Sequence, residues 1–225
     1  MIRYYCIHLA RGIPVILKMF TFGIYLTNCY VLGCEETKEV IVIDPGFDRD
    51  KEAKEVLDFV EQNGLHVKYI VNTHGHADHT AGNGILKKAT GALILIHEDD
   101  AIMLTSVAKT FSRVFGIRVT SPPADRTLHD GNVIQVGRIK LVVLQTPGHS
   151  RGGISLLGEN FVFSGDTLFA GSIGRTDFPG ASFEEIMQSI KTKLMILPDH
   201  FKVYPGHGPI TTIGEEKRHN PFLRM

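Results

Sequence analysis

Residues 69–82 read YIVNTHGHADHTAG, in which an apolar run leads directly into a cluster of polar side chains. His74, His76, Asp78 and His79 all lie within six residues of one another. Imidazoles and carboxylates gain little from being crowded together inside a fold unless a positive charge lies among them. The segment therefore predicts a metal site at the end of a buried strand.

The spacing within this cluster divides it into two pairs. Side chains at positions i and i+2 of an extended segment project the same way, so His74 and His76 can share one ion. Asp78 and His79 are adjacent at the expected start of a helix, where both can face a second ion. We therefore expect two metal positions rather than one.

Three other apolar strands also end at a possible ligand. "VVLQTPGH" ends in His149, "FVFSGD" in Asp166 and "VYPGH" in His207. Loops at the ends of strands are where functional sites are usually built. We expect His149 to complete a three-histidine set with His74 and His76, and His207 to join Asp78 and His79. Asp166 has two carboxylate oxygens and can bridge both ions.

The predicted ligands are five imidazoles and two carboxylates, without a thiolate. This set is typical of zinc, iron or manganese in open sites rather than of a closed structural zinc site. We expect two divalent metal ions, with zinc as the first choice and iron or manganese as alternatives. Asp78 and Asp166 are the expected catalytic carboxylates. Such a centre keeps a net positive charge and favours an anionic or polarised substrate.

Composition limits the function classes further. The 225 residues are enough for one sizeable domain, and the formal net charge of zero favours neither nucleic acid nor an anionic membrane. No apolar run is long enough to cross a bilayer. The three cysteines, Cys6, Cys29 and Cys34, form no CxxC pair, so we expect thiols in a reducing, cytoplasmic setting.

The pattern of apolar residues predicts alternating strands and helices. Helical spacing covers 49–63 and stops at Gly64, and a second helix is expected between Thr80 and Gly91. The sequence "SFEE" from Ser182 has the form of a helix capping box. Residues 99–127 are less regular and suggest a lid or connecting loop. The alternation predicts an α/β sandwich in one continuous domain.

The first eighteen residues have no clear periodicity. Their apolar region is interrupted by His8, Arg11 and Lys18, which argues against a secretory signal. Periodic structure is expected to begin at Phe20. We therefore expect residues 1–18 to be a poorly ordered extension and residues 19–225 to be the catalytic domain.

The motifs "THGHADH", "PGH", "SGD" and "PGHG" together resemble those of the metallo-β-lactamase superfamily. The resemblance covers nearly the whole chain from about Phe20. It implies a four-layer αβ/βα sandwich, in which two mixed sheets pack face to face with helices outside. It also implies a dinuclear metal site between the sheets at one edge.

Two further segments favour one branch of that superfamily. "GDTLFAGSIGRTDFPG" and "EEKRHNPFLR" are similar to the short form of the hydroxyacylglutathione hydrolases, the glyoxalase II group. The resemblance implies that Arg175 and Arg224 hold carboxylates of the thiol and that Asp44 supports the metal ligands. Asp177 stands where the family often has tyrosine, which supports thioester chemistry better than glutathione itself.

The function expected from these residues is hydrolysis of a small-molecule thioester, such as S-lactoylglutathione or a related hydroxyacyl thioester, by a hydroxide that bridges the two ions. The alternatives are a persulfide dioxygenase with a single iron and a lactonase of the same superfamily. A nuclease and a binding protein without catalysis have less support from the sequence. We expect neither nucleic acid nor a membrane as a partner, and the oligomeric state stays open.

Overall fold

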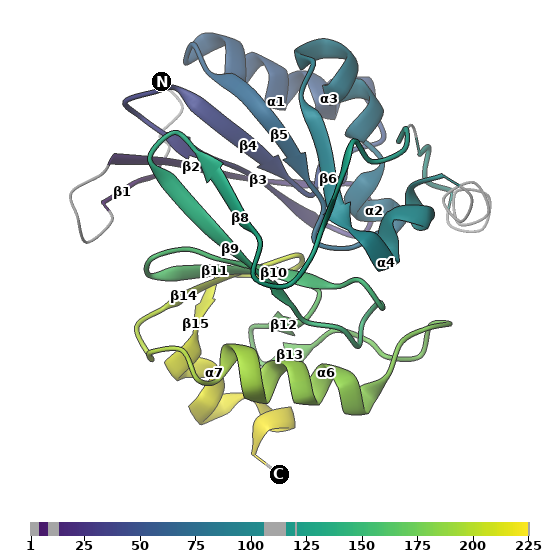
Figure 1. The fold of residues 1–225 in the computed structure, drawn as a ribbon, viewed down its shortest axis with the longest axis vertical. Helices are drawn as coiled ribbons and strands as arrows, with labels where there is room; N and C mark the ends of the chain where they lie inside the picture. The colour runs from purple at the N-terminus through teal and green to yellow at the C-terminus, as the bar shows by residue number, and fades with distance from the viewer. Residues whose placement is uncertain (1–4, 9–13, 106–115, 120, 225) are drawn as a thin grey trace.

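The computed structural model describes residues 5–8, 14–105, 116–119 and 121–224, the first of these ranges by its backbone alone. The described chain forms two large β-sheets with helices on their outer faces (Figure 1). Helices α1 and α3 lie over one sheet, and α6 and α7 lie beneath the other. The α/β class expected from the sequence is confirmed.

The first sheet has seven strands in sequence order. It contains β1 (Tyr5–His8), β2 (Pro14–Phe22), β3 (Thr27–Cys34), β4 (Glu39–Ile43), β5 (His66–Val71), β6 (Leu93–His97) and β7 (Arg126–Leu128). Strands β1 to β4 pair antiparallel, and β4 to β7 pair parallel. The carboxyl ends of β4, β5 and β6 therefore meet at one edge.

The second sheet has six strands in the order β15-β14-β11-β10-β9-β8. They are β8 (Val133–Val136), β9 (Ile139–Gln145), β10 (Ile154–Leu157), β11 (Phe161–Gly165), β14 (Lys202–Pro205) and β15 (Thr211–Thr212). A ribbon of β12 (Leu168–Phe169) and β13 (Ser172–Ile173) stands apart. Strands β11 and β14 are parallel neighbours, so their carboxyl ends lie side by side.

The helices connect these strands. They are α1 (Asp50–Gln62), α2 (Ala77–Thr80), α3 (Asn83–Thr90), α4 (Glu98–Ala101), α6 (Phe183–Ser189) and α7 (Ile213–His219). A π-helical segment at Ile190–Leu194 continues α6, and short 3-10 turns cover Ile102–Leu104 and Pro221–Leu223. None of the helices in the described ranges is both long and apolar enough to cross a membrane.

Alternation along the strands produces the four layers. In β3, Tyr30 and Leu32 face the interior between the sheets, whereas Cys29 and Val31 face the helices of the first layer. In β11, Phe163 likewise belongs to the core between the sheets, while its neighbour Val162 packs against α6. The central strands are buried on both faces, and this explains why their sequences are continuous apolar runs. The predicted αβ/βα sandwich is confirmed.

Two helix boundaries follow the expected chemistry. Gly91 ends α3 with φ of 73°, a left-handed conformation that glycine adopts without strain. The Ser182 side chain accepts a hydrogen bond from the backbone N–H of Glu185 and so caps the start of α6. Both predicted helix ends are therefore confirmed.

The boundary expected at residues 18 and 19 is wrong. Strand β2 begins at Pro14, and Val15, Ile16 and Leu17 are buried and pair with β3. Val15 and Leu17 pack in the core between the two sheets and Ile16 packs against the helices of the first layer, so these residues are part of the domain. Residues 1–4 and 9–13 of the expected extension lie outside the described residues, as do residues 106–115 and 120 of the expected loop at 99–127.

Candidate metal centre

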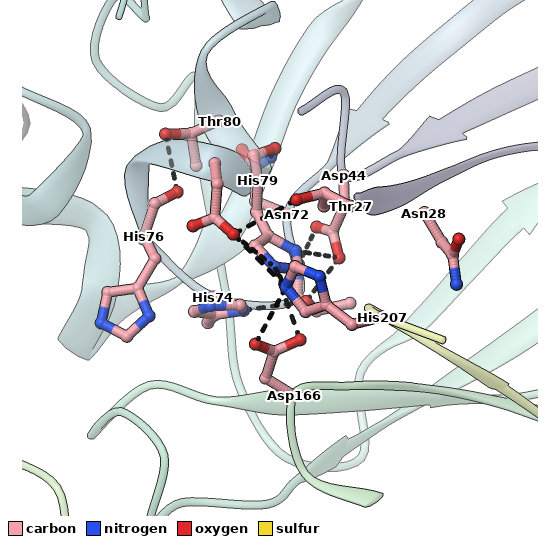
Figure 2. Close-up of polar contacts among 12 residues, drawn as sticks. Thr27, Asn28, Asp44, Asn72, His74, His76, His79, Thr80, Asp166 and His207 are labelled. Carbon is pink, nitrogen blue, oxygen red and sulfur yellow. Dashed lines mark hydrogen bonds and ion pairs between the residues drawn. The ribbon is translucent and has the colours of Figure 1, made fainter. Parts of the chain in front are cut away.

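The predicted ligands come from four strand ends and meet at one edge of the sandwich. His74 lies after β5 of the first sheet, and His149, Asp166 and His207 follow β9, β11 and β14 of the second. Backbone bonds tie the two edges together: Ile154 N donates to the Thr73 carbonyl at 2.8 Å. Figure 2 shows His74, His79, His207 and Asp166 pointing toward one another.

The side chains form overlapping groups whose ligand atoms lie within 4.8 Å of one another. The first trio is His74, His76 and His149, and the second trio is Asp78, His79 and His207. Asp166 lies between them, with Oδ2 3.5 Å from His149 Nε2 and 3.4 Å from His207 Nε2. The structure thus brings all seven predicted ligands together in the predicted groups.

Four of the imidazoles are held at Nδ1, so that Nε2 faces the shared space. The Nδ1 acceptors are the Thr73 hydroxyl for His74, the Asp44 carboxylate for His79, the Arg175 carbonyl for His149 and the Tyr25 carbonyl for His207. His76 instead presents Nδ1, which lies 2.9 Å from His149 Nε2. Fixing the second ring nitrogen is how proteins orient histidine ligands toward a metal.

The two trios differ in charge. Burial, together with the neighbouring imidazoles, lowers the pKa of His74 well below its usual value, and burial beside His149 lowers the pKa of His76 to about 4. These rings are neutral at neutral pH, as metal binding requires. In the second trio burial works against the charged form, but Asp166 and Asp78 raise the pKa of His79 to about 9 and that of His207 to about 11. The protons on His79 and His207 offset the negative charge of Asp78 and Asp166, and a bound cation would take the place of these protons.

Two buried atoms show that the site fits a metal. Among the described residues, neither His74 Nε2 nor Asp166 Oδ1 has a hydrogen-bond partner, although both are buried. Buried polar atoms are almost always satisfied, and each exception needs an explanation such as an ion. His74 and Asp166 belong, with His79, to one group that could hold a metal ion, and a cation there would give both atoms a partner.

Asp44 lies beneath the second trio. Its Oδ2 is 3.0 Å from His79 Nδ1 and accepts from the Thr73 hydroxyl at 2.6 Å, while Oδ1 accepts from Thr73 N at 2.8 Å. Asp44 has φ of 50°, which is uncommon outside glycine and aims this carboxylate at the loop after β5. It occupies the supporting position that the family resemblance implied.

A cavity of about 370 Å³ opens over the trios. Its apolar wall is formed by Tyr25, Ala77, Ile117, Phe169, Ile173 and Phe178. Arg175 also lines it, stacked on the Phe178 ring at 4.1 Å and paired through two hydrogen bonds with Asp177. The cavity is therefore mainly apolar beyond the metal ligands.

Arg224 does not match its expected role. Its guanidinium donates to the Arg218 carbonyl at the C-terminal end of α7, and it is not among the described residues that line the cavity. The segment after His207 folds back as α7, and the 3-10 turn at Pro221–Leu223 then leaves Arg224 beside the end of α7. The sequence motif alone could not show this.

Asp100 was not singled out from the sequence, yet it contacts both ligand loops of the first trio. It lies three residues beyond the last residue of β6, and its carboxylate accepts hydrogen bonds from Gly75, Ser150 and Gly152. The sequence feature that could have identified Asp100 is the one that identified the metal ligands: a polar residue close after an apolar strand.

The sandwich and the ligand cluster at its edge define a class of protein: a two-sheet α/β protein with a histidine and aspartate metal-binding site. A family profile described as the metallo-beta-lactamase superfamily matches residues 23–207. The chain belongs to that superfamily, and the cluster is the superfamily's metal-binding site.

Relatives and solved structures agree with this assignment. The hydroxyacylglutathione hydrolase GloC of Haemophilus influenzae is 37% identical over 205 residues, covering 87% of this chain and 92% of GloC. The crystal structure of the B3 metallo-beta-lactamase BLEG-1 is 35% identical with a TM-score of 0.85, covering 93% of this chain and 100% of that one. TTHA1623, solved in a di-iron-bound form, is 35% identical with a TM-score of 0.81 and covers 92% of this chain and 100% of its own.

Proposed function

We propose that this protein is a cytoplasmic hydrolase that cleaves a small-molecule thioester, such as S-lactoylglutathione or a related hydroxyacyl thioester, with two divalent metal ions. The observation that carries the proposal is the convergence of two complete ligand trios around Asp166 at the base of the cavity. The similarity to GloC supports the thioester, and the di-iron form of TTHA1623 supports two ions.

The first trio would hold one ion and the second trio the other, with Asp166 contributing to both. Bound ions supply a nucleophile by lowering the pKa of water and polarise the acyl carbonyl as Lewis acids. The chain's own part is to fix these ligands: Asp44 holds His79, and the carbonyls of Tyr25 and Arg175 hold His207 and His149. Zinc suits the ligands best, and iron and manganese also accept them.

The leaving group favours a thioester. A thiol has a pKa of about 8.5, so thiolate departs near neutral pH without a proton from the protein. An amine would need a positioned proton donor. The apolar cavity wall, including Phe169 and Ile173, suits the uncharged part of an acyl thioester.

Recognition of the thiol would fall to Arg175, because Arg224 is held beside α7. Arg175 gives its Nε and Nη2 to Asp177, so the Asp177 carboxylate competes with a carboxylate of glutathione for the guanidinium. This competition predicts weaker selection of glutathione than of the thioester bond. Other thiol carriers are therefore candidates for the same cavity.

The decisive experiment compares substrates on protein loaded with a defined metal. We expect the rate of S-lactoylglutathione hydrolysis, measured as released thiol, to exceed the rates of hydrolysis of a lactone and of a β-lactam. The variant Asp166→Ala should lose this activity. Full metal occupancy with no thioester hydrolysis would refute the proposal, and preferential cleavage of the β-lactam would move the assignment toward a metallo-beta-lactamase such as BLEG-1.

One observation favours a second candidate, persulfide dioxygenation with a single iron. His74, His79 and Asp166 form a group of two histidines and one carboxylate, the ligand set typical of non-haem iron oxygenases. The complete trio of Asp78, His79 and His207 gives hydrolysis with two ions the stronger support. Oxygen consumption on addition of glutathione persulfide, by protein holding one iron, would reverse this order.

A further inference from the structure

Asp100 connects the two loops that carry the first trio. Its Oδ2 accepts from Gly75 N at 3.0 Å, between His74 and His76 in the chain. The same oxygen accepts from the Ser150 hydroxyl at 2.7 Å, and Oδ1 accepts from Gly152 N at 2.7 Å. One carboxylate on α4 thus binds the loop after β5 to the loop after β9.

The junction is buried and closely packed. Asp100 is 1% exposed, so its carboxylate is hydrogen-bonded by these three protein donors and not by water. A Cβ added at Gly152 would lie 2.6 Å from Asp100 N, and one added at Gly75 would lie 3.0 Å from the Asp100 carbonyl oxygen. Neither loop can move toward α4, and hydrogen bonds prevent both from moving away.

The arrangement mirrors Asp44 at the other half of the site. Asp44 binds His79 and so orients the second trio directly, and it also binds Thr73, whose hydroxyl lies against His74 Nδ1. Among the described residues, none of the hydrogen-bond partners of Asp100 is an imidazole; its partners Gly75, Ser150 and Gly152 lie on the loops that carry His76 and His149. Hydrogen bonds to a buried carboxylate are among the stronger ones in proteins, which suits them to this task.

We propose that Asp100 is the positioning residue of the first trio: it holds His74 and His76 at the correct distance from His149 and thereby sets the metal affinity of that half of the centre. The inference stands on the metal site and not on the thioester proposed above. Its consequence is selective, because the second trio is delivered by α2 and the loop after β14.

The test uses the variant Asp100→Asn. An amide keeps one accepting oxygen, so at least one of the three donors loses its partner.

Metal-stripped protein is titrated with Co²⁺, whose visible spectrum reports ligand geometry, in two backgrounds. His207→Ala leaves the first trio complete, and His149→Ala leaves the second. Loss of a supporting hydrogen bond typically weakens metal binding about 10–100-fold. We expect a weakening of this size, with an altered Co²⁺ spectrum, in the His207→Ala background, and less than a two-fold change in the other.

Asp125→Asn is the matched control. Asp125 accepts from Ile94 N at 2.8 Å and from Lys87, so its loss also removes support from a loop but leaves both ligand loops intact. Equal Co²⁺ affinities of Asp100→Asn and Asp125→Asn at the first trio would overturn the proposal. So would equal weakening in the two backgrounds. If Asp100→Asn does not fold, Ser150→Ala removes a single donor and should weaken the first trio alone; an unchanged affinity and spectrum there would equally refute it.

Discussion

Gly206 offers the sharpest test of how closely the chain packs around the metal ligands. A Cβ at this position would lie 2.1 Å from Asp166 Oδ1 and 2.7 Å from His79 Cε1. The backbone cannot easily move away, because Gly206 N donates to the Gly165 carbonyl at 2.8 Å and its carbonyl accepts from Asn28 N at 2.7 Å. The variant Gly206→Ala should therefore displace the Asp166 carboxylate.

The size of the effect follows from the overlap. Relieving it takes a shift of about 1 Å, and a misplacement of that size costs about 100-fold in rate. Overpacking also costs about 1–3 kcal/mol of stability. For a protein of this length that lowers the melting temperature by roughly 2–12 °C. We expect reduced metal content by elemental analysis and a fall of about 100-fold in kcat/KM for S-lactoylglutathione.

Gly208→Ala is the control two residues along. Gly208 has φ of 74° and no atom within 4 Å of an added Cβ, so the change introduces backbone strain without an overlap. The strain costs about 1 kcal/mol, or a melting temperature lower by about 2–4 °C. We expect metal content and rate to stay near the wild-type values. Gly206→Ala protein with full metal occupancy and wild-type turnover would refute the packing argument.

Four further outcomes are expected. Asp166→Ala should remove the oxygens between the trios and most turnover, and near-normal kcat with intact metal would contradict the role of Asp166. Asp177→Asn should free Arg175 and lower KM for S-lactoylglutathione by a few-fold, measured against an uncharged thioester whose KM should not change. Metal removal by a chelator should lower the melting temperature, because one ion at about 100 times its Kd adds about 2.7 kcal/mol; superimposable unfolding curves would count against a folded-state site. Asp125→Asn should lower the free energy of unfolding by about 1 kcal/mol at pH 7. Burial opposes the charge of Asp125, but hydrogen bonds from Lys87 and Ile94 hold its pKa below the usual value. The stabilisation is therefore present above the unfolded-state pKa and fades as pH falls through the folded-state pKa, so denaturant titrations near pH 3 should show a smaller difference.

The sequence alone predicted which residues meet as possible metal ligands and how they group, because their chemistry is local. Imidazoles and carboxylates directly after apolar strands can be recognised without coordinates, and the spacing of His74, His76, Asp78 and His79 assigns them to two trios. The same local rules located α3 and the start of α6, since glycine and serine act on the backbone beside them. The four layers were expected from the resemblance to the metallo-β-lactamase superfamily, whereas the local pattern by itself predicted only an α/β sandwich.

Only the tertiary structure decided the contacts between distant segments. Val15 to Lys18 look irregular in the sequence, yet pairing with β3 makes them part of a strand. Arg224 matches a motif, but the fold of α7 carries it away from the cavity. Asp100 follows an apolar strand as the ligands do, but its role depends on loops 25 and 50 residues away that meet it. Such contacts depend on which chain segments the packed sheets bring together, and that packing is a property of the whole core rather than of any local pattern.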